Sequence, residues 1–360
     1  MEIKIGDRLI GNGHPTYFIA DISANHDGEL ERAKMLIRLA KEAGADAAKF
    51  QNFRAPKIVS DYGFKSLGGQ LSHQATWKKS VFEVYRDASI SFDWTPILKE
   101  ECDKVGIHYF SSPYDFAAVD MLDPYVPAFK VGSGDITWLE ILERMARKGK
   151  PVILSTGASD IGDVQRAVRT ILAINRQLVL LQCNTNYTAS PENFDHIHIR
   201  VIDTYRTMFP DAVLGISDHT SGHATVLGAV ALGARVVEKH FTDDTSRIGP
   251  DHPFSMTPEI WRLMVDRARE LERALGVADK FVAGNETETV VVQRRCLRAA
   301  RDIRSGEVFS RDMIDVLRPA TKGAILPYEV ENVIGTRALK DIPRGKELRW
   351  TDLGEAERDA

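Results

Sequence analysis

The sequence predicts an α/β protein built as a (β/α)8, or TIM, barrel with a small module after it. Apolar runs of strand length alternate with amphipathic helical segments eight times along the chain, as in parallel strands joined by helices. Polar side chains gather where these runs end. The length of 360 residues accommodates one barrel of about 250 residues and a further small domain.

The eight expected strands have ordinary length and follow one another in chain order. They read YFIADIS (17–23), AAKFQNF (47–53), IHYFSSPY (107–114), AFKVGSG (128–134), PVILSTG (151–157), LVLLQCNTN (178–186), VLGISDH (213–219) and VVEKHFT (236–242). Segments with helical periodicity follow them, among them 30–44, 138–150 and 257–276. The connection over 54–91 lacks such periodicity, so we expect a long loop at the mouth of the barrel that can serve as a lid.

The carboxyl-terminal part of the chain has a different pattern. We assign 1–280 to the barrel, 281–293 to a polar, threonine-rich linker, and 294–360 to the small module. Such a linker is long enough to let the module reach a neighbouring chain.

Composition excludes several classes of protein. The apolar content of 43% supports a sizeable core, and the net charge of −4 is mild. We find no cluster of Lys and Arg interleaved with aromatic residues, so nucleic acid is not an expected partner. No apolar stretch approaches the length of about 18 residues that a membrane span needs, and the first residues do not resemble a signal peptide, so we expect a cytoplasmic protein. The three widely spaced cysteines indicate reduced thiols.

Two histidines mark a candidate metal site. His219 and His240 end consecutive predicted strands that one helical crossover joins, so both imidazoles are expected at the same end of the barrel. The acidic residues Asp218 and Glu238 stand beside them. Two imidazoles would leave coordination positions for water or substrate. The alternative is that both are core histidines with backbone partners.

Two lysines mark a candidate anion site. Lys49 and Lys130 end the second and fourth strands, and a lysine that points into a barrel requires a counter-charge. Because side chains alternate along a strand, Lys49 and Gln51 share a face, as do Glu238 and His240. The turns FSSP, GSGD and LSTG supply hydroxyl and backbone donors for a phosphate or carboxylate. Ser155 lacks the activating His and carboxylate order of a hydrolase, so we expect it to bind rather than attack.

These segments resemble the successive motifs of the sialic acid synthase family. The resemblance rests on ADISANHDG, AKFQ, FSSPYD, FKVGSGD, ILSTGAS, GISDHTSGH, VVEKHFTDD and GPDHPFSM, which occur in order over nearly the whole chain. The stretch from about Arg294 to Leu353 resembles the family's second domain, the antifreeze-like or SAF module. The family condenses phosphoenolpyruvate with an N-acetylated mannose-type aldose, which gives a nine-carbon 2-keto-3-deoxy acid and phosphate.

The resemblance also implies roles for individual residues. Phosphoenolpyruvate would contact Lys49, Ser112, Lys130, Ser133, Ser155 and Ser217. A divalent metal, in the first place Mn²⁺ with Mg²⁺ or Co²⁺ as alternatives, would bind His219 and His240. The aldose would contact Gln51, Asp135, Tyr187 and Asp251, together with Arg318 from the SAF module of a partner chain, which implies a domain-swapped homodimer. Asp21 or Glu238 would carry protons.

Three positions depart from the family pattern, and two rival functions stay open. Asp21 and Asp135 stand where the family usually has Glu, and Thr188 stands where it usually has Pro. The acceptor can therefore be N-acetylmannosamine, a diacetamido trideoxy relative, mannose or mannose phosphate; the GSGD motif is nearer to the sialic and legionaminic branch than to the pseudaminic one. One rival is another phosphoenolpyruvate-dependent aldol synthase with a different aldose. The other is a non-catalytic sugar-binding protein of polysaccharide assembly.

Overall fold

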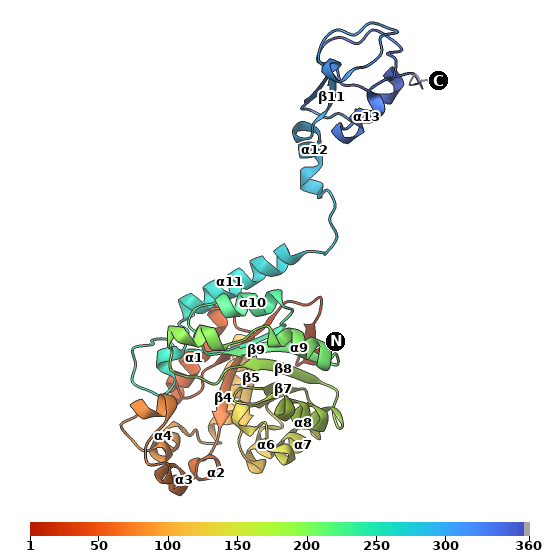
Figure 1. The fold of residues 1–360 in the computed structure, drawn as a ribbon. Helices are drawn as coiled ribbons and strands as arrows, with labels where there is room; N and C mark the ends of the chain where they lie inside the picture. The colour runs from red at the N-terminus through yellow and green to blue at the C-terminus, as the bar shows by residue number, and fades with distance from the viewer. Residues whose placement is uncertain (356–360) are drawn as a thin grey trace. The chain divides into compact units, whose positions relative to one another are not determined.

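The computed structural model describes residues 1–355, and the chain divides into two compact units, Met1–Gly276 and Val277–Ala360. The first unit is a parallel eight-stranded sheet that curls into a nearly closed barrel (Figure 1). The sheet order is β5-β4-β3-β10-β9-β8-β7-β6, and β5 and β6, at its two ends, lie next to each other. Its strands are β3 (Tyr17–Asp21), β4 (Ala47–Asn52), β5 (His108–Pro113), β6 (Phe129–Val131), β7 (Val152–Ser155), β8 (Leu178–Cys183), β9 (Ala212–Asp218) and β10 (Val236–His240). The predicted barrel is confirmed.

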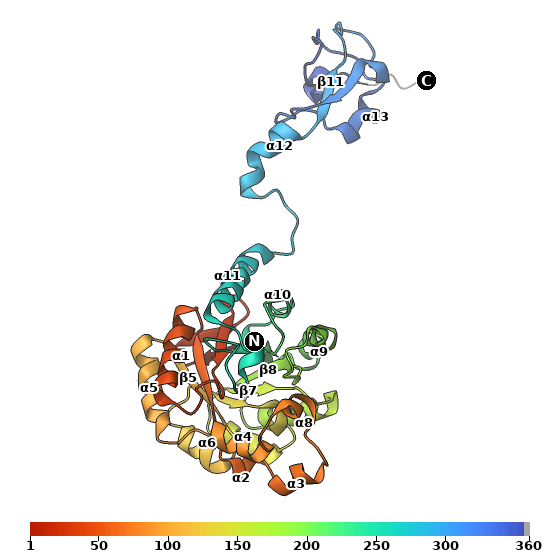
Figure 2. The same ribbon diagram turned by 90° about the vertical axis from the view of Figure 1, so that its left-hand side faces the viewer.

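Helices surround this sheet (Figures 1 and 2). Each strand is followed by one of them: α1 (Leu30–Glu42), α5 (Trp94–Val105), α6 (Phe116–Leu122), α7 (Leu139–Ala146), α8 (Ile161–Leu172), α9 (Val201–Met208), α10 (Ala224–Ala231) and α11 (Pro258–Leu275). Helix α8 illustrates why they pack: it buries Val164, Ala167, Val168 and Ile171, which lie on one face because a helix turns once in 3.6 residues. The main core therefore lies between the helices and the outer face of the barrel.

A hairpin that the sequence analysis did not predict packs against the barrel. Strands β1 (Glu2–Ile5) and β2 (Arg8–Gly11) pair antiparallel, and their apolar side chains pack with residues near the amino ends of the barrel strands, such as Tyr17, Ala47 and Val236. The turn needs a glycine, because Gly6 has φ +59° and a Cβ there would approach the His108 ring to 2.6 Å. The hairpin therefore lies at the end of the barrel opposite the predicted site.

The connection over 54–91 has more structure than a long loop. It contains the short helices α2 (Ala55–Ile58), α3 (Asp61–Ser66) and α4 (Val81–Ala88). Ala55, Val59 and Val81 form a small separate core in which Trp77 and Tyr85 also pack. The expected long loop therefore carries short helices of its own. Each helix is too short to show a clear helical period, but together they bury apolar surface in the small core.

The second unit contains a short helix and a small β structure. Helix α12 (Thr287–Gln293) precedes β11 (Cys296–Ala299), which pairs antiparallel with β12 (Ile314–Leu317), and α13 (Val330–Val333) follows. A separate core includes Leu297, Phe309, Ile314, Ile342 and Leu348.

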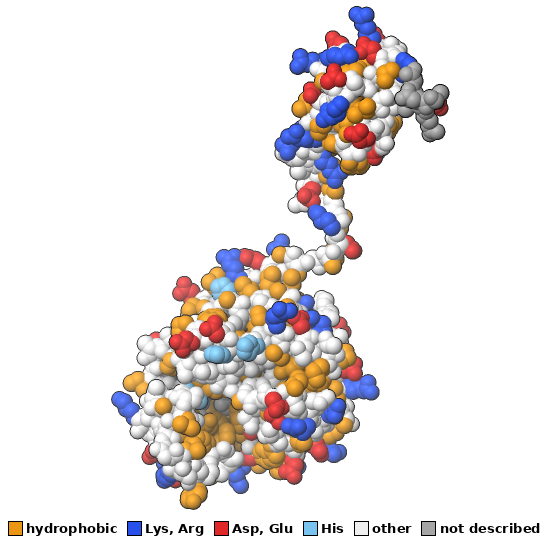
Figure 3. All heavy atoms as spheres, in the orientation of Figure 1, with side chains coloured by type: hydrophobic (Ala, Val, Ile, Leu, Met, Phe, Trp, Pro, Cys, Tyr) orange, Lys and Arg blue, Asp and Glu red, His pale blue; other side chains and the backbone are white. Residues whose placement is uncertain are grey.

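Three further observations bear on the expectations from composition. No helix within residues 1–355 is long and apolar enough to cross a membrane. On the face of the first unit that Figure 3 shows, basic and acidic side chains are interspersed rather than segregated by sign. All three cysteines are buried and free of disulfides.

Candidate active site

The predicted anion-binding side chains meet inside the barrel, near the carboxyl ends of the strands. Lys49 on β4, Lys130 on β6 and Glu238 on β10 are all almost fully buried, with exposed fractions of 2%, 2% and 4%. They meet because each occupies an inward-facing position on its own strand. We call these three residues, with Asp21, the ionic floor.

Lys49 contacts both carboxylates of the ionic floor. Its Nζ donates a hydrogen bond to Asp21 Oδ2 at 2.6 Å and lies 3.6 Å from Glu238 Oε2. Burial opposes a charged ammonium, but the two carboxylates outweigh it and hold the pKa of Lys49 above its usual value. Lys49 is therefore a fixed cation at the base of the site.

Lys130 contacts hydroxyls and a backbone carbonyl besides its carboxylate. Its Nζ donates to Ser155 Oγ at 2.7 Å and to the Val131 carbonyl at 2.8 Å, and lies 3.4 Å from Glu238 Oε1. Ser217 Oγ donates to the same Glu238 oxygen at 3.0 Å. Burial lowers the pKa of Lys130. Burial would raise the pKa of Glu238, but Lys130 and Lys49 lower it to about 2, so Glu238 is an anion between two cations.

Several buried polar atoms at the site have no hydrogen-bond partner within the described chain: Ser112 Oγ, Glu238 Oε2 and His240 Nδ1. Such atoms are rare in folded proteins because each costs free energy when it is removed from water without a partner. Ser133 differs, since its Oγ accepts a hydrogen bond from the Gly157 backbone N–H at 2.9 Å. The unpartnered atoms identify groups that can still bind a ligand.

The two predicted histidines lie side by side, with ring centroids 5.3 Å apart. His219 Nδ1 lies 2.8 Å from the Asn184 carbonyl, so this nitrogen carries the hydrogen. Burial would lower the pKa of His219, but a hydrogen bond with the Cys183 thiol raises it. His240 Nε2 lies 3.5 Å from Asp21 Oδ2. Burial lowers the pKa of His240 to about 3, which keeps its imidazole neutral. Only His219 has the backbone partner that a core histidine would have.

His219 and His240 could supply two ligands to a metal ion. A metal needs neutral imidazole nitrogens. Burial keeps His240 neutral, whereas the Cys183 thiol favours the charged form of His219. Within residues 1–355 no group of three or more His, Cys, Asp or Glu side chains is arranged to hold a metal. Water or substrate would therefore have to complete the coordination.

Asp218 does not lie beside the histidines, contrary to the expectation from its place in the sequence. Its carboxylate faces the opposite side of β9 and accepts a hydrogen bond from Lys239 Nζ at 2.6 Å. Both side chains are fully buried. The reason is strand alternation, which sends Ser217 into the barrel and Asp218 out of it.

The predicted sugar-contacting residues line a cavity of about 430 Å³ above the ionic floor, which we call the inner cavity. Gln51, Asp135, Tyr187 and Asp251 line it together with His240. The Tyr187 ring lies edge-on to the His219 ring, at a centroid distance of 4.4 Å. Burial raises the pKa of Asp135 to about 6 despite the opposing charge of Lys130.

Arg318 is not among these residues. It lies in the second unit, where it is exposed. Its contact with a sugar in a partner chain stays a prediction.

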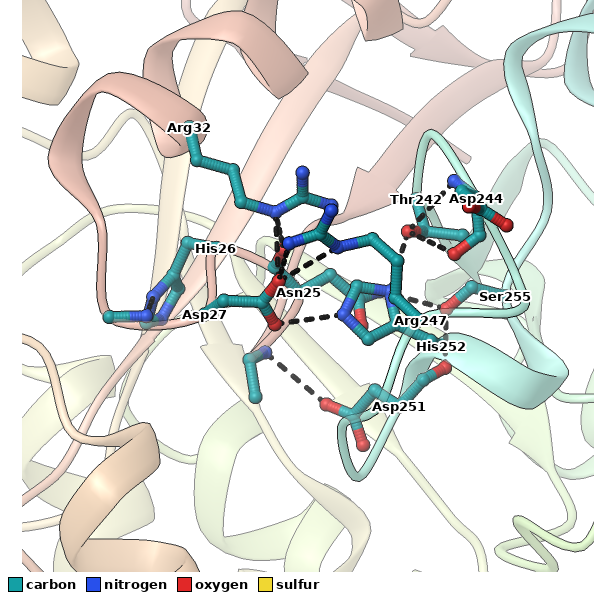
Figure 4. A network of polar contacts seen from close by, with 12 residues as sticks. Asn25, His26, Asp27, Arg32, Thr242, Asp244, Arg247, Asp251, His252 and Ser255 are labelled. Atoms are coloured by element: carbon teal, nitrogen blue, oxygen red, sulfur yellow. Dashed lines mark hydrogen bonds and ion pairs between the residues drawn. The ribbon is translucent and has the colours of Figure 1, made fainter.

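A polar network that sequence reasoning missed positions Asp251 (Figure 4). Asp27 accepts hydrogen bonds from Arg247 Nη2 at 2.7 Å and from His252 Nε2 at 2.9 Å. Asp251 Oδ2 accepts from the Ala24 backbone N–H at 3.2 Å. These contacts join the loop after β3 to the loop after β10. No spacing rule pairs residues more than 220 positions apart, so the sequence held no local signal for them.

Comparison with known proteins agrees with this geometry. Residues 36–280 match the NeuB family, and residues 294–354 match the SAF domain. The chain is 34% identical to the human N-acetylneuraminate-9-phosphate synthase, over 93% of this chain and 92% of that protein. It is also 34% identical to the N,N'-diacetyllegionaminic acid synthase of Legionella pneumophila, over 95% and 96% of the two chains.

A solved structure matches over the full length of the chain. The spore coat polysaccharide biosynthesis protein SpsE of Bacillus subtilis superimposes with a TM-score of 0.65 and 31% identity, over 99% of this chain and 100% of that one. The match to the NeuB family covers more than half of the chain, and the alignments to the two relatives cover nearly the full length of each. The chain therefore belongs to the NeuB family and ends in a SAF domain.

Proposed function

We propose that this protein is a nonulosonic acid synthase that condenses phosphoenolpyruvate with an N-acetylmannosamine-type aldose. Its relatives are synthases of sialic, legionaminic and pseudaminic acids. The observation that carries the proposal is the ionic floor, in which two buried lysines contact two carboxylates and share one of them, next to a cavity that His240 lines. Two buried lysines near two imidazoles suit an anionic enol and an aldehyde.

Phosphoenolpyruvate would bind at the ionic floor. Lys49 and Lys130 supply charge for its phosphate and carboxylate, and a buried site strengthens such contacts because little water screens them. The serine hydroxyls already present around the two lysines supply further donors: Ser112, Ser133, Ser155 and Ser217. Ser112 Oγ, which has no partner within the described chain, gains one in this arrangement.

His219 and His240 would hold a divalent ion, with Mn²⁺ proposed and Mg²⁺ or Co²⁺ as alternatives. Such an ion supplies Lewis-acid polarisation of the aldehyde oxygen when it is bound. The chain contributes the pre-set orientation: the Asn184 carbonyl fixes the His219 ring, as partners of metal-binding histidines commonly do.

The reaction would run by carbon–carbon bond formation followed by loss of phosphate. Carbon three of the enol attacks the aldehyde carbon, and the aldehyde oxygen takes up a proton. One water adds to carbon two, and the resulting intermediate expels phosphate by carbon–oxygen cleavage. Lys49 and Lys130 stabilise the phosphate throughout. Asp21 and Glu238 are the carboxylates proposed to transfer protons, because they lie between the lysines and His240.

The aldose would occupy the inner cavity. Gln51, Asp135, Tyr187 and Asp251 line it and offer amide, carboxyl and phenol groups for hydroxyls. We propose in addition that Arg318 reaches the sugar in a partner chain, in a domain-swapped homodimer. Asp21 and Asp135 are one methylene shorter than the family's usual Glu, so the acceptor has room for an additional substituent.

Two rivals are less well supported. Another phosphoenolpyruvate-dependent aldol synthase with a phosphorylated aldose would require a second phosphate pocket, and no further arginine cluster lies at a strand end of the predicted barrel. A non-catalytic sugar-binding protein would have no use for two buried lysines around one carboxylate, since burying those charges costs free energy.

The proposal is tested by phosphate release from phosphoenolpyruvate with Mn²⁺ and a panel of N-acetylmannosamine, its 2,4-diacetamido derivative, mannose and mannose 6-phosphate. We expect release with at least one aldose and a loss of roughly 100-fold or more in the His219→Ala variant. His196→Ala, an exposed histidine, is the matched control and should keep full activity. Absence of release with every acceptor in the panel would reject the proposed acceptors.

A further inference from the structure

A second cavity, of about 970 Å³, adjoins the inner cavity on the side of the mouth, and we call it the outer cavity. One wall comes from the connection over 54–91, through Thr76 and Trp77. The opposite wall comes from the loop after β10, through Arg247 and Pro250. Both cavities are lined by a common set of residues: Ala24, His73, Trp77, Val84, Ala88, Tyr187 and Pro250. A ligand in the inner cavity can therefore extend outward into this space.

His73 and Tyr187 mark the passage between the two cavities. Their rings meet edge to face, with centroids 5.0 Å apart. His73 Nδ1 is buried and has no hydrogen-bond partner within the described chain. A polar group of a ligand that passes between the cavities would satisfy this nitrogen.

The walls of the outer cavity are mainly apolar, and most of its charges are already paired. Lys79 Nζ lies 2.7 Å from Asp87 Oδ2, and Arg247 Nη2 lies 2.7 Å from Asp27 Oδ2. Lys78 is the one cation of the outer cavity without an ion-pair partner in residues 1–355, and it is exposed. A phosphate dianion is usually held by several cationic or N–H donors. The outer cavity therefore suits an uncharged group better than a phosphate.

We propose that the outer cavity receives the distal end of the acceptor aldose and selects an uncharged, partly apolar end. The inference rests on the proposed function, in which the aldehyde end reacts above the ionic floor and the far carbons point toward the mouth. The chemical class that fits is a hexose with a second acetamido group and a deoxy terminal carbon, such as 2,4-diacetamido-2,4,6-trideoxymannose. Its methyl groups would pack on Trp77, Val84 and Ala88, while an amide or hydroxyl would meet His73.

Thr188 belongs to the same space. It lines the outer cavity but not the inner one, as does Thr76 on the facing wall. Its hydroxyl donates to Asn186 Oδ1 at 2.6 Å, so the side chain is held by its own loop. These two threonines allow the outer cavity to be filled without touching the inner one.

The experiment compares kcat/KM for three acceptors: N-acetylmannosamine, its 6-phosphate, and the diacetamido trideoxy sugar. We expect the diacetamido sugar to be preferred over the phosphate by about tenfold or more, since one extra apolar group in a fitted pocket is worth about 10- to 200-fold. Thr76→Trp and Thr188→Trp should each remove this preference by lowering kcat/KM for the diacetamido sugar about tenfold or more. Thr207→Trp, an exposed position on α9, is the matched control.

Each other outcome overturns the inference. Preference for the 6-phosphate that Lys78→Glu abolishes would assign the outer cavity to an anion. An equal loss for all three acceptors in the tryptophan variants would show that the outer cavity does not discriminate between acceptors, which would overturn the inference.

A binding measurement tests the outer cavity even if the proposed synthase activity is absent. If no acceptor is turned over, calorimetric titration of the diacetamido sugar into the full chain decides the matter. Binding that Thr76→Trp weakens about tenfold or more would support the outer cavity. Absence of binding, or binding that this variant leaves unchanged, would overturn it.

Discussion

Two buried clusters of lysine and carboxylate lie on opposite faces of the barrel sheet. The inner cluster is the ionic floor, and the outer cluster is the pair Lys239 and Asp218. Lys239 and Asp218 lie on the outer face of β10 and β9, whereas Glu238 lies on the inner face of β10 with Lys49 and Lys130 around it. Both clusters remove charges from water, which costs several kcal/mol per ion unless partners compensate. Burial of charge therefore does not by itself distinguish them.

The difference between the clusters lies in their hydrogen bonds. Asp218 accepts hydrogen bonds from Lys239, Thr220 and Thr225, and Lys239 also donates to the Thr220 carbonyl at 2.6 Å. The inner cluster leaves Glu238 Oε2 without a hydrogen bond. One cluster is complete without a ligand, whereas the other has polar capacity left over. An unsatisfied oxygen within the cluster, rather than the buried charge alone, distinguishes the ionic floor from the Lys239–Asp218 pair.

The pKa shifts of the charged groups also differ, although cations and anions are equal in number in both clusters. Burial would raise the pKa of Asp218, but Lys239 and the threonine hydroxyls lower it below its usual value. One cation there matches one anion. In the ionic floor the pKa of Lys130 is lowered, because burial is only partly offset by Glu238. An anionic ligand would restore the missing stabilisation of Lys130.

The largest expected effect is on activity. Lys130→Met should lower kcat/KM for phosphoenolpyruvate by roughly 10³-fold, as expected when a buried donor to developing charge is lost. The melting temperature should fall less than in Lys239→Met, because Glu238 keeps Lys49 as a cation whereas Asp218 would keep none. Steady-state kinetics and thermal unfolding of the same preparation measure both. If Lys130→Met keeps its activity, the inner cluster serves stability rather than catalysis, as the outer cluster does.

The opposite pattern is expected for the outer cluster. Lys239→Met leaves Asp218 buried without its cation, which should lower the free energy of unfolding by about 3–5 kcal/mol. Activity per folded molecule should be retained, since Lys239 faces away from the cavity. Urea unfolding with an active-site titration separates the two quantities.

A second substitution checks the cause of that loss. The double variant Lys239→Met, Asp218→Asn should recover most of the lost stability, because it removes the unpaired charge. If it recovers none, the loss comes from packing of the lysine stem and the electrostatic interpretation is wrong.

The two clusters also show what the sequence could predict. Lys49, Ser217, Glu238 and His240 were placed together from strand ends and alternation, because both are local properties of a strand. The same rule sends Asp218 to the outer face, so the sequence held the signal that it leaves the site. The expectation that Asp218 lies beside His219 is wrong because side chains alternate along β9.

Other features depended on long-range contacts that a single sequence does not reveal. The network around Asp27 joins two loops through His252 and Arg247. His73 reaches the site because the connection over 54–91 builds its own small core. Tertiary packing, rather than local periodicity, decides the conformation of such segments. The sequence therefore predicts neither the network around Asp27 nor the position of His73.

The smallest expected effect concerns Asp135, a carboxyl of the inner cavity that belongs to neither cluster. Burial raises its pKa from 3.8 to about 6, so the folded protein binds this proton more tightly than the unfolded chain does. The contribution of Asp135 to stability is therefore most favourable below about pH 4, declines as pH rises to about 6, and is constant above that. Asp135→Asn should accordingly be more stable than the parent by about 3 kcal/mol at pH 8, and nearly equal to it at pH 4. Urea unfolding at both pH values measures this difference, and a gain of equal size at both would show that it arises from packing and not from the buried charge.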